Sequence, residues 1–170
     1  DQLPLEETLA RLKPWLESAD KPKLGQHLKY DRHVLRNHGI ELRGIVHDTL
    51  LESYILETDK PHDLGALASR HCNLATIAYD DITGKGASRI SFAEVPLERA
   101  GEYAAEDADV TLRVHQALLP QLQAEEKLQS LYRDIELPVA EILYRMERYG
   151  VLIDVFALAV CAYEIFTLKR

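Results

Sequence analysis

Cysteine is scarce in this 170-residue sequence, which has only Cys72 and Cys161, far apart and in no Cys-x-x-Cys pair. A disulfide framework or a zinc ribbon is therefore not expected, and a reducing cytoplasm is the default location. Glycine and proline are also few, with eight and seven residues, while hydrophobic residues make up 46% and charged residues 28% of the chain. These proportions exclude collagen-like, low-complexity and disordered chains and indicate an ordinary globular domain.

The sequence also lacks a long apolar run. Its longest uninterrupted run, residues 155–163, has nine residues. This is about half of the roughly 20 residues that a helix needs to cross a bilayer. Residues 1–7 contain neither a basic region nor an apolar region, so no signal peptide is expected. We therefore expect a soluble chain without a membrane partner.

Basic residues are outnumbered by acidic ones. The chain has 20 Lys and Arg against 28 Asp and Glu, which gives a formal net charge of −8. This balance argues against a broad basic surface that would hold DNA or an anionic membrane by charge alone. It leaves open a nucleic acid that is bound through metal ions. At roughly 100–200 residues per domain, the length predicts one domain with one substantial core.

Hydrophobic periodicity and helix-end signals predict a helix-dominated α/β chain with two short strands, each followed by a helix. In chain order, the sequence predicts a helix over 4–18, a strand end at 23–28, a helix up to Gly39, a strand at 44–47, helices over 50–56 and 63–71, a mobile loop at 80–88, and helices over 96–119, 120–131 and 138–150. Asp63 is a favourable N-cap, and Thr49 with Glu52 resembles a capping box. Pro120 is expected to disturb the longest helix.

Two aspartates fall on helix faces that are otherwise apolar. With 100° per residue, Asp107 lies in the middle of the apolar stripe of the helix over 96–119. The neighbouring acids of that helix point away from the stripe and are expected to be solvated: Glu102, Glu106 and Asp109. Asp31 lies in the same way among the apolar residues of its own helix. The pattern predicts that two helices each direct one buried carboxylate inward.

Two interpretations of such aspartates remain open. For either residue alone, a structural ion pair or a hydrogen bond to a loop is the commoner outcome. An unpaired buried carboxylate costs several kcal/mol, and a divalent cation offsets this cost because it supplies the countercharge and prefers oxygen ligands. Two inward aspartates favour the metal. Tyr103, one turn before Asp107, is either a core aromatic or a hydroxyl that reaches a water or phosphate oxygen at the metal.

Segments that contain these residues resemble the motifs of a known enzyme family. Residues 24–31, Leu-Gly-Gln-His-Leu-Lys-Tyr-Asp, resemble the second motif of the DEDD-type 3′→5′ exonucleases, and residues 103–107 fit the third motif, Tyr-x-x-x-Asp. Residues 48–56 also resemble the proofreading exonuclease domain of bacterial family A DNA polymerases, the DNA polymerase I type. Residues 135–138 and 146–154 resemble the lead into its polymerase domain. The ordered motifs make this resemblance far more specific than Tyr-x-x-x-Asp alone.

This resemblance implies an RNase H-like α/β layer fold and a proofreading reaction, in which water removes a 3′-terminal nucleotide during DNA replication and repair. Two Mg²⁺ or Mn²⁺ ions would activate the nucleophile and stabilise the leaving oxygen. Asp31 and Asp107 would be metal ligands, and Tyr103 would orient the nucleophile. The positions that would touch a single-stranded or frayed 3′ end of DNA are Gln26, His27, Tyr30 and Tyr79.

The family's first motif, Asp-x-Glu on an N-terminal strand, is missing from this sequence. The Asp-x-Glu that does occur, at 134–136, follows the third motif in a helical region. We therefore expect the first strands of the sheet and two of the four metal carboxylates to be missing, and the chain alone to be weak or inactive. His27 stands where the family usually has Asn. Residues 1–132 are assigned to a partial exonuclease domain, and 133–170 to the start of the connection into a covalently attached polymerase domain.

Other functions stay open at this stage. A non-catalytic module that guides DNA and supports the polymerase is one, and an RNase D-like RNA exonuclease is another. The seven histidines suggest zinc, with His27 near Asp31 and His71 beside Cys72, but no set of three or four convergent ligands is visible in the spacing. Residues 84–88 are not a phosphate-binding P-loop, because the required Gly and Ser or Thr positions are not matched.

Overall fold

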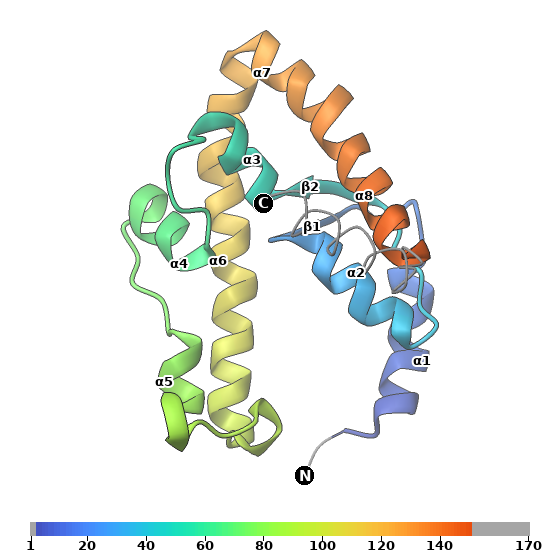
Figure 1. The fold of residues 1–170 in the computed structure, drawn as a ribbon, viewed down its shortest axis with the longest axis vertical. Coiled ribbons are helices and arrows are strands. Elements are labelled where there is room, and N and C mark those ends of the chain that lie inside the picture. Colours follow the sequence, from blue (N-terminus) through green and yellow to red (C-terminus); the bar gives the residue numbers. More distant parts are fainter. Residues whose placement is uncertain (1–2, 151–170) are drawn as a thin grey trace, which may run out of the picture.

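The structure, a computed structural model, describes residues 3–150 and is a helix-rich α/β arrangement (Figure 1). Its helices and strands are, in chain order, α1 (Leu5–Leu16), β1 (Lys23–Gly25), α2 (Leu28–Asn37), β2 (Ile45–Asp48), α3 (Thr49–Leu56), α4 (Leu64–Leu67), α5 (Tyr79–Thr83), α6 (Leu97–Ala124), α7 (Glu126–Leu131) and α8 (Leu137–Tyr149). Turns of π-helix lie at Ala68–Cys72 and Tyr132–Glu136, and turns of 3-10 helix at Gly86–Ser88 and Phe92–Glu94. Within this described part, the helices are too short or too polar for a bilayer crossing.

The two predicted strands, β1 and β2, form a small parallel sheet, with α2 as the crossover between them. Parallel neighbours need such a connection because both strands start at the same end of the sheet. The register places Gly25 beside Asp48, at the strand ends from which the chain enters α2 and α3. A Cβ at Gly25 would collide with the side chain of Leu28, which would have to move to make room for it. The strand predictions are therefore confirmed.

Helix α6 is the long central helix, and the hydrophobic core lies against its second half. Figure 1 shows α4 and α5 along one side of α6, and α1, α2, α8 and the strands on the other, with α3 crossing α6 between them. The core cluster consists of Leu67, Ala68, Val110, Val114 and Leu118. The prediction that Pro120 disturbs this helix is wrong, because α6 continues to Ala124. Full burial of Leu118 and Leu122, on either side of Pro120, offsets the backbone hydrogen bond that proline cannot make.

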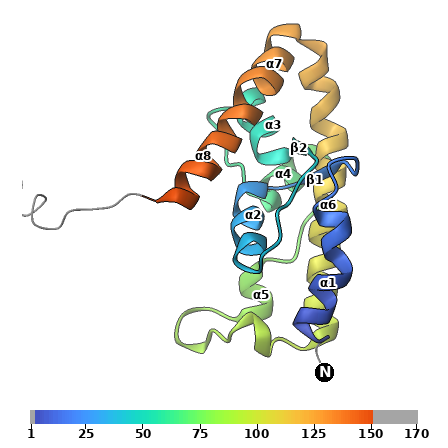
Figure 2. The same cartoon turned by 90° about the vertical axis from the view of Figure 1, so that its right-hand side faces the viewer.

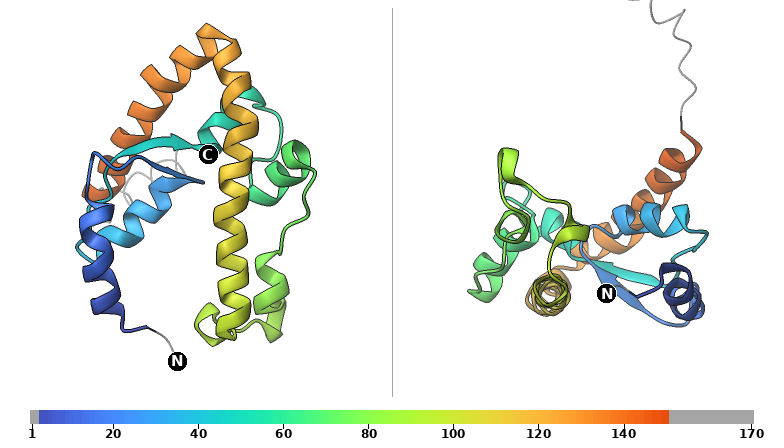
Figure 3. Two further views of the ribbon diagram at one scale, coloured as in Figure 1. Left: turned by 180° about the vertical axis from the view of Figure 1, so that it is seen from behind. Right: turned by 90° about the horizontal axis from the view of Figure 1, so that it is seen from below.

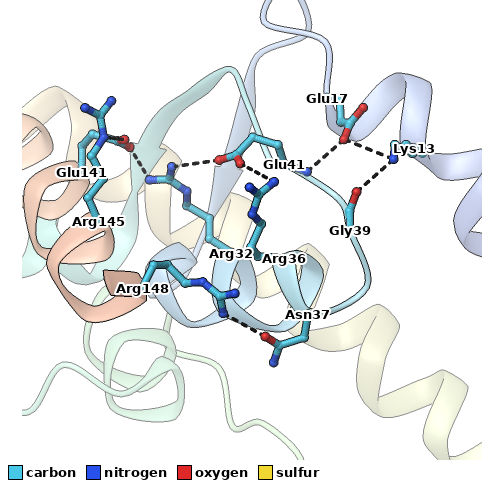
Figure 4. Close-up of polar contacts among 10 residues, drawn as sticks. All are labelled: Lys13, Glu17, Arg32, Arg36, Asn37, Gly39, Glu41, Glu141, Arg145 and Arg148. Atoms are coloured by element: carbon cyan, nitrogen blue, oxygen red, sulfur yellow. Dashed lines mark hydrogen bonds and ion pairs between the residues drawn. The ribbon is translucent and has the colours of Figure 1, made fainter. Parts of the chain in front are cut away.

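Helix α8 packs against α2 through charged side chains (Figure 4). The buried Arg32 of α2 donates a hydrogen bond to Glu141 of α8, and its Nη2 lies 3.7 Å from an oxygen of Glu41. Its guanidinium also lies 3.7 Å from the centre of the Tyr144 ring. These partners supply countercharge and ring contact to the buried guanidinium, while its Nε has no hydrogen-bond partner among the described residues. Figures 2 and 3 show how α7 turns the chain back, so that α8 descends toward α2.

Local details of two segments differ from the predictions. Residues 80–88 are not simply a loop, because they contain the end of α5 and a 3-10 turn. Asp48, not Thr49, caps α3. Glu52, the expected second member of the capping box, is fully buried instead. Asp63 caps α4 as predicted, by accepting the backbone N–H of Ala66. The apolar run at 155–163 lies outside the described residues.

Candidate functional site

One cavity collects most of the predicted site residues. It has a volume of about 870 Å³ and lies where the end of β1, helix α2 and the first half of α6 meet. Five of the seven predicted site residues line it: Gln26, Asp31, Tyr79, Tyr103 and Asp107. Another cavity, of about 940 Å³ between α2 and α8, is lined by none of the seven. Segments up to about 80 residues apart in sequence thus converge on the first cavity.

Asp31 is exposed, so the prediction that α2 buries it is wrong. The buried residues of α2 are Leu28 and Arg32, because α8 covers the face that carries Arg32. Surrounding protein atoms still remove part of the hydration of the Asp31 carboxylate, and this raises its pKa. The nearby His27 opposes that rise, and the charge of Asp48 adds to it.

Asp107 is half-buried rather than at the centre of a buried stripe. The buried residues of α6 begin only at Val110, because the core cluster covers the second half of the helix. Loss of hydration raises the pKa of Asp107, whereas a hydrogen bond from Tyr103 lowers it. Burial, the charge of Asp107 and this same hydrogen bond raise the pKa of Tyr103 to about 12. The Tyr103 hydroxyl therefore keeps its proton at neutral pH and acts as a donor.

An aromatic cluster borders the cavity beside Asp107. The ring centres of Tyr79 and Tyr103 lie 6.3 Å apart, and Phe92 lies 6.0 Å and 6.2 Å from them. Glu106, which was predicted to be solvated, is half-buried and accepts the Ile77 backbone N–H at 2.7 Å. This bond ties the segment before α5 to α6 and so helps to place Tyr79. Phe92 and Glu106 were missed because their roles depend on contacts between distant segments.

The turn between β1 and α2 carries the other predicted DNA contacts. Gln26 donates to the His62 backbone oxygen at 2.8 Å and accepts from the Thr49 hydroxyl, so protein groups hold both ends of its amide. His27 has a left-handed backbone with φ of 60°, a conformation in which Asn and His are both enriched. Tyr30 is 65% exposed, which leaves its ring face open to solvent. His27 and Tyr30 lie outside the cavity lining.

Asp48 holds this turn in place, and its role was not predicted. Its buried carboxylate accepts the backbone N–H groups of His27 at 3.0 Å, Leu28 at 2.8 Å and Leu50 at 3.0 Å. One side chain therefore caps the starts of both α2 and α3. Burial raises the pKa of Asp48, although the three N–H groups lower it. An aspartate just before a predicted helix is an N-cap signal that could have identified part of this role.

Replacing Asp107 with Asn should stabilise the metal-free chain at neutral pH. The folded-state pKa of Asp107 is raised above its ordinary value, which applies to the unfolded state. At a pH between these two pKa values, the folded state therefore binds more protons than the unfolded state. The favourable contribution of this group is complete below the ordinary pKa and is lost as the pH rises through the raised value. Asn removes the ionised carboxylate but keeps an oxygen that can accept from Tyr103.

Thermal unfolding in EDTA measures this effect. The Asp107→Asn midpoint should exceed that of the parent chain at pH 7, and the two should converge near pH 3, below the ordinary pKa of about 3.9. Asp109→Asn is the matched control, since Asp109 is exposed and paired with Arg113, and it should give no such gain. A midpoint at pH 7 that is equal to or below the parent value would contradict the prediction.

Comparison with known proteins places these motifs in a family. The 3′-5′ exonuclease model of DNA polymerase A matches residues 1–123. DNA polymerase I of Pseudomonas aeruginosa is 46% identical over 168 residues, which cover 97% of this chain and 18% of the relative. DNA polymerase I of Rhizobium leguminosarum is 40% identical over 155 residues, which cover 91% of this chain and 15% of the relative. The chain spans less than a fifth of the length of these curated relatives.

A solved structure agrees with this assignment. The structure described as the POL domain of Pol1 from M. smegmatis, in complex with DNA primer-template and dNTP, is similar with a TM-score of 0.72 and 25% identity, over 96% of this chain and 25% of that chain. The expected RNase H-like α/β fold is confirmed by the family match and by the helix-rich arrangement around a parallel sheet. Because the family model matches 123 of the 170 residues, the chain belongs to the 3′-5′ exonuclease family of DNA polymerase A.

Proposed function

We propose that this chain is the main part of a metal-dependent proofreading exonuclease, which removes nucleotides from single-stranded or frayed 3′ ends of DNA. The observation that carries the proposal is the convergence of Asp31 and Asp107, from two different helices, on one cavity. Among residues 3–150, neither carboxylate forms an ion pair with a basic side chain, unlike the structural ion pairs elsewhere in the molecule. The family match supports the same reaction.

The two aspartates fit a divalent metal ion. Both carboxylates lose hydration, which raises the pKa of each, and neither has a basic partner within ion-pair distance in the described residues. Such oxygen ligands suit Mg²⁺ or Mn²⁺. Bound ions would supply an activated water and stabilise the leaving oxygen. Asp31 and Asp107 are two ligands of a larger set, and the Asp-x-Glu that completes it in the family is not matched in this sequence. We therefore expect weak or no activity from the 170 residues alone.

Other side chains have roles around the reacting phosphate. The protonated Tyr103 hydroxyl, held by Asp107, would orient the attacking water. The 43%-exposed Tyr79 and the 65%-exposed Tyr30 present aromatic faces on which unpaired bases can stack. His27 lies beside Tyr30, with ring centres 6.3 Å apart. Gln26 would contact DNA only by exchanging one of its present hydrogen bonds.

The remaining assignments concern the parent protein. We propose that it is a cytoplasmic bacterial polymerase and that residues 133–170 begin the connection to its polymerase domain. Helix α8, which lies within this segment, contacts α2 through charged side chains, and α2 is the helix that carries Asp31. Lys29 and His33 of α2 both bond to Glu147 near the end of α8. The connection would thus brace the helix that carries a metal ligand.

Nucleotide release tests the proposal. The polymerase polypeptide that contains these residues should release mononucleotides from 3′-labelled single-stranded DNA in Mg²⁺ or Mn²⁺, and none in EDTA. No release, with polymerase activity intact, would favour a non-catalytic DNA-guiding module. Preference for RNA would favour an RNase D-like enzyme. The 170-residue chain serves as a second sample, and robust release by it would contradict only its expected weakness.

A further inference from the structure

Three side chains from two separate parts of the sequence converge beside the core. They are His47 of β2, Glu52 of α3 and His115 of α6, and their potential ligand atoms all lie within 4.8 Å of one another. The Nδ1 atom of His115 lies 2.8 Å from Oε1 of Glu52, and the Nδ1 atom of His47 lies 3.1 Å from the same oxygen. The two imidazole rings have centres 4.4 Å apart. One carboxylate therefore faces two imidazole nitrogens.

The charge of Glu52 has no permanent partner nearby. The residue is 0% exposed, and among residues 3–150 its ion-pair neighbours are the two histidines, with no Lys or Arg. Histidine carries a charge only when it is protonated. A buried carboxylate without a countercharge is costly, so this position needs a proton, on the carboxylate or on an imidazole, or a cation.

Two buried atoms of the cluster also lack hydrogen-bond partners. Oε2 of Glu52 has none, and neither does Nδ1 of His47, whose ring is close to the carboxylate but not aligned to share a hydrogen bond with it. Buried polar atoms are rarely left unpaired in native structures. A bound ion would satisfy both atoms at once, because each can offer a lone pair to it.

Tyr132 also contacts the carboxylate. Its hydroxyl accepts the Asp48 backbone N–H at 3.0 Å and donates to Oε1 of Glu52 at 3.5 Å. Its ring stacks on His47, with centres 6.1 Å apart and planes within 7°. Hydrogen-bonded residues around metal ligands commonly fix the ligand orientation in this way.

We propose that His47, Glu52 and His115 form a binding site for a Zn²⁺-class transition metal ion, in addition to the candidate catalytic site. Two imidazoles and one carboxylate are ligands that zinc takes, with water in the fourth position, and imidazole nitrogen favours Zn²⁺ over Mg²⁺. His115 lies eight residues after Asp107 on α6, about 12 Å further along the helix axis. The ion would join β2, α3 and α6. This site does not depend on the proposed exonuclease function.

Zinc titration of the metal-stripped 170-residue chain, followed by calorimetry, tests the site. We expect one tight site, and at least about a 100-fold loss of affinity in His47→Gln and in His115→Gln, since even residues around the ligands change affinity by roughly 10- to 100-fold. His38→Gln is the matched control, because His38 is exposed and outside the cluster, and it should leave affinity unchanged. The double variant Asp31→Asn, Asp107→Asn should also keep full zinc affinity, which separates this site from the catalytic one.

Circular dichroism establishes whether each variant folds before the titration. His47 is 29% exposed at the edge of the cluster, so His47→Gln decides the outcome if His115→Gln unfolds. Co²⁺ adds a second readout, since its visible absorption should show nitrogen-containing coordination in the parent chain and lose it in His47→Gln. Zinc affinity that is equal in the parent and His47→Gln, or no binding at all, would show that the cluster is an ion-pair network only.

Discussion

Replacing Asp107 with Ala should lower 3′-nucleotide release by the parent polymerase polypeptide by about 1,000-fold or more, while nucleotide incorporation stays unchanged. A loss of this size equals about 4 kcal/mol of transition-state stabilisation, which is within what a misplaced metal ion and its activated water can account for. Asp107 is also the acceptor of the Tyr103 hydrogen bond. The substitution therefore removes the proposed metal ligand and releases the hydroxyl that would orient the water.

The matched control for this prediction is Asp109→Ala. Asp109 lies on the same helix and is exposed. Its carboxylate forms an ion pair with Arg113 at 2.7 Å, and it does not line the cavity. Release should fall by less than about twofold in this variant, because exposed ion pairs contribute little. Equal losses in both variants would indicate damage to α6 rather than loss of a ligand. Unchanged release in Asp107→Ala would overturn the assignment of the catalytic site.

Asp48→Ala should lower the free energy of unfolding of the chain by about 3–5 kcal/mol. The substitution leaves three backbone N–H groups without an acceptor, and each unmade bond to a buried group costs roughly 1–3 kcal/mol. Water can reach the more exposed of these groups and recover part of the loss. Because the carboxylate caps both α2 and α3, the change also loosens the turn that leads to Asp31.

Urea unfolding followed by circular dichroism measures this loss, and Asp63→Ala provides the comparison. Asp63 is also an N-cap aspartate, but it is exposed and accepts one N–H, from Ala66. Its replacement should cost only about 1 kcal/mol. Asp48→Asn should fall between the two, because an amide keeps one acceptor oxygen instead of two. A loss below about 1 kcal/mol in Asp48→Ala would show that the bonds to Asp48 are replaced by other contacts.

Sequence pattern predicted the elements where short-range chemistry decides the structure. Gly39 follows the end of α2, Asp63 caps α4, and Pro138 lies at the start of α8, all as expected. Each of these signals acts within one helical turn, so distant contacts do not change it. The ordered motifs around Asp31 and Tyr103 also identified the exonuclease family, which the family match confirmed.

Tertiary packing decided how far each site residue is buried from solvent. The apolar stripe of α2 predicted a buried Asp31, yet the contact with α8 buries Arg32 and leaves Asp31 exposed. The apolar stripe of α6 placed Asp107 at its centre, yet the core covers the helix only from Val110 onward. Periodicity shows which residues share a face, but it does not show which neighbour will cover that face.

The histidine cluster shows the same distinction most clearly. His115 and Glu52 are 63 residues apart, and no ligand spacing in the sequence connects them. Motifs, helix ends and the family could be determined from the sequence because they depend on residues close together or on a fixed order along the chain. The convergence of His47, Glu52 and His115 was decided only by the packing of β2, α3 and α6, because burial and proximity are properties of the folded chain.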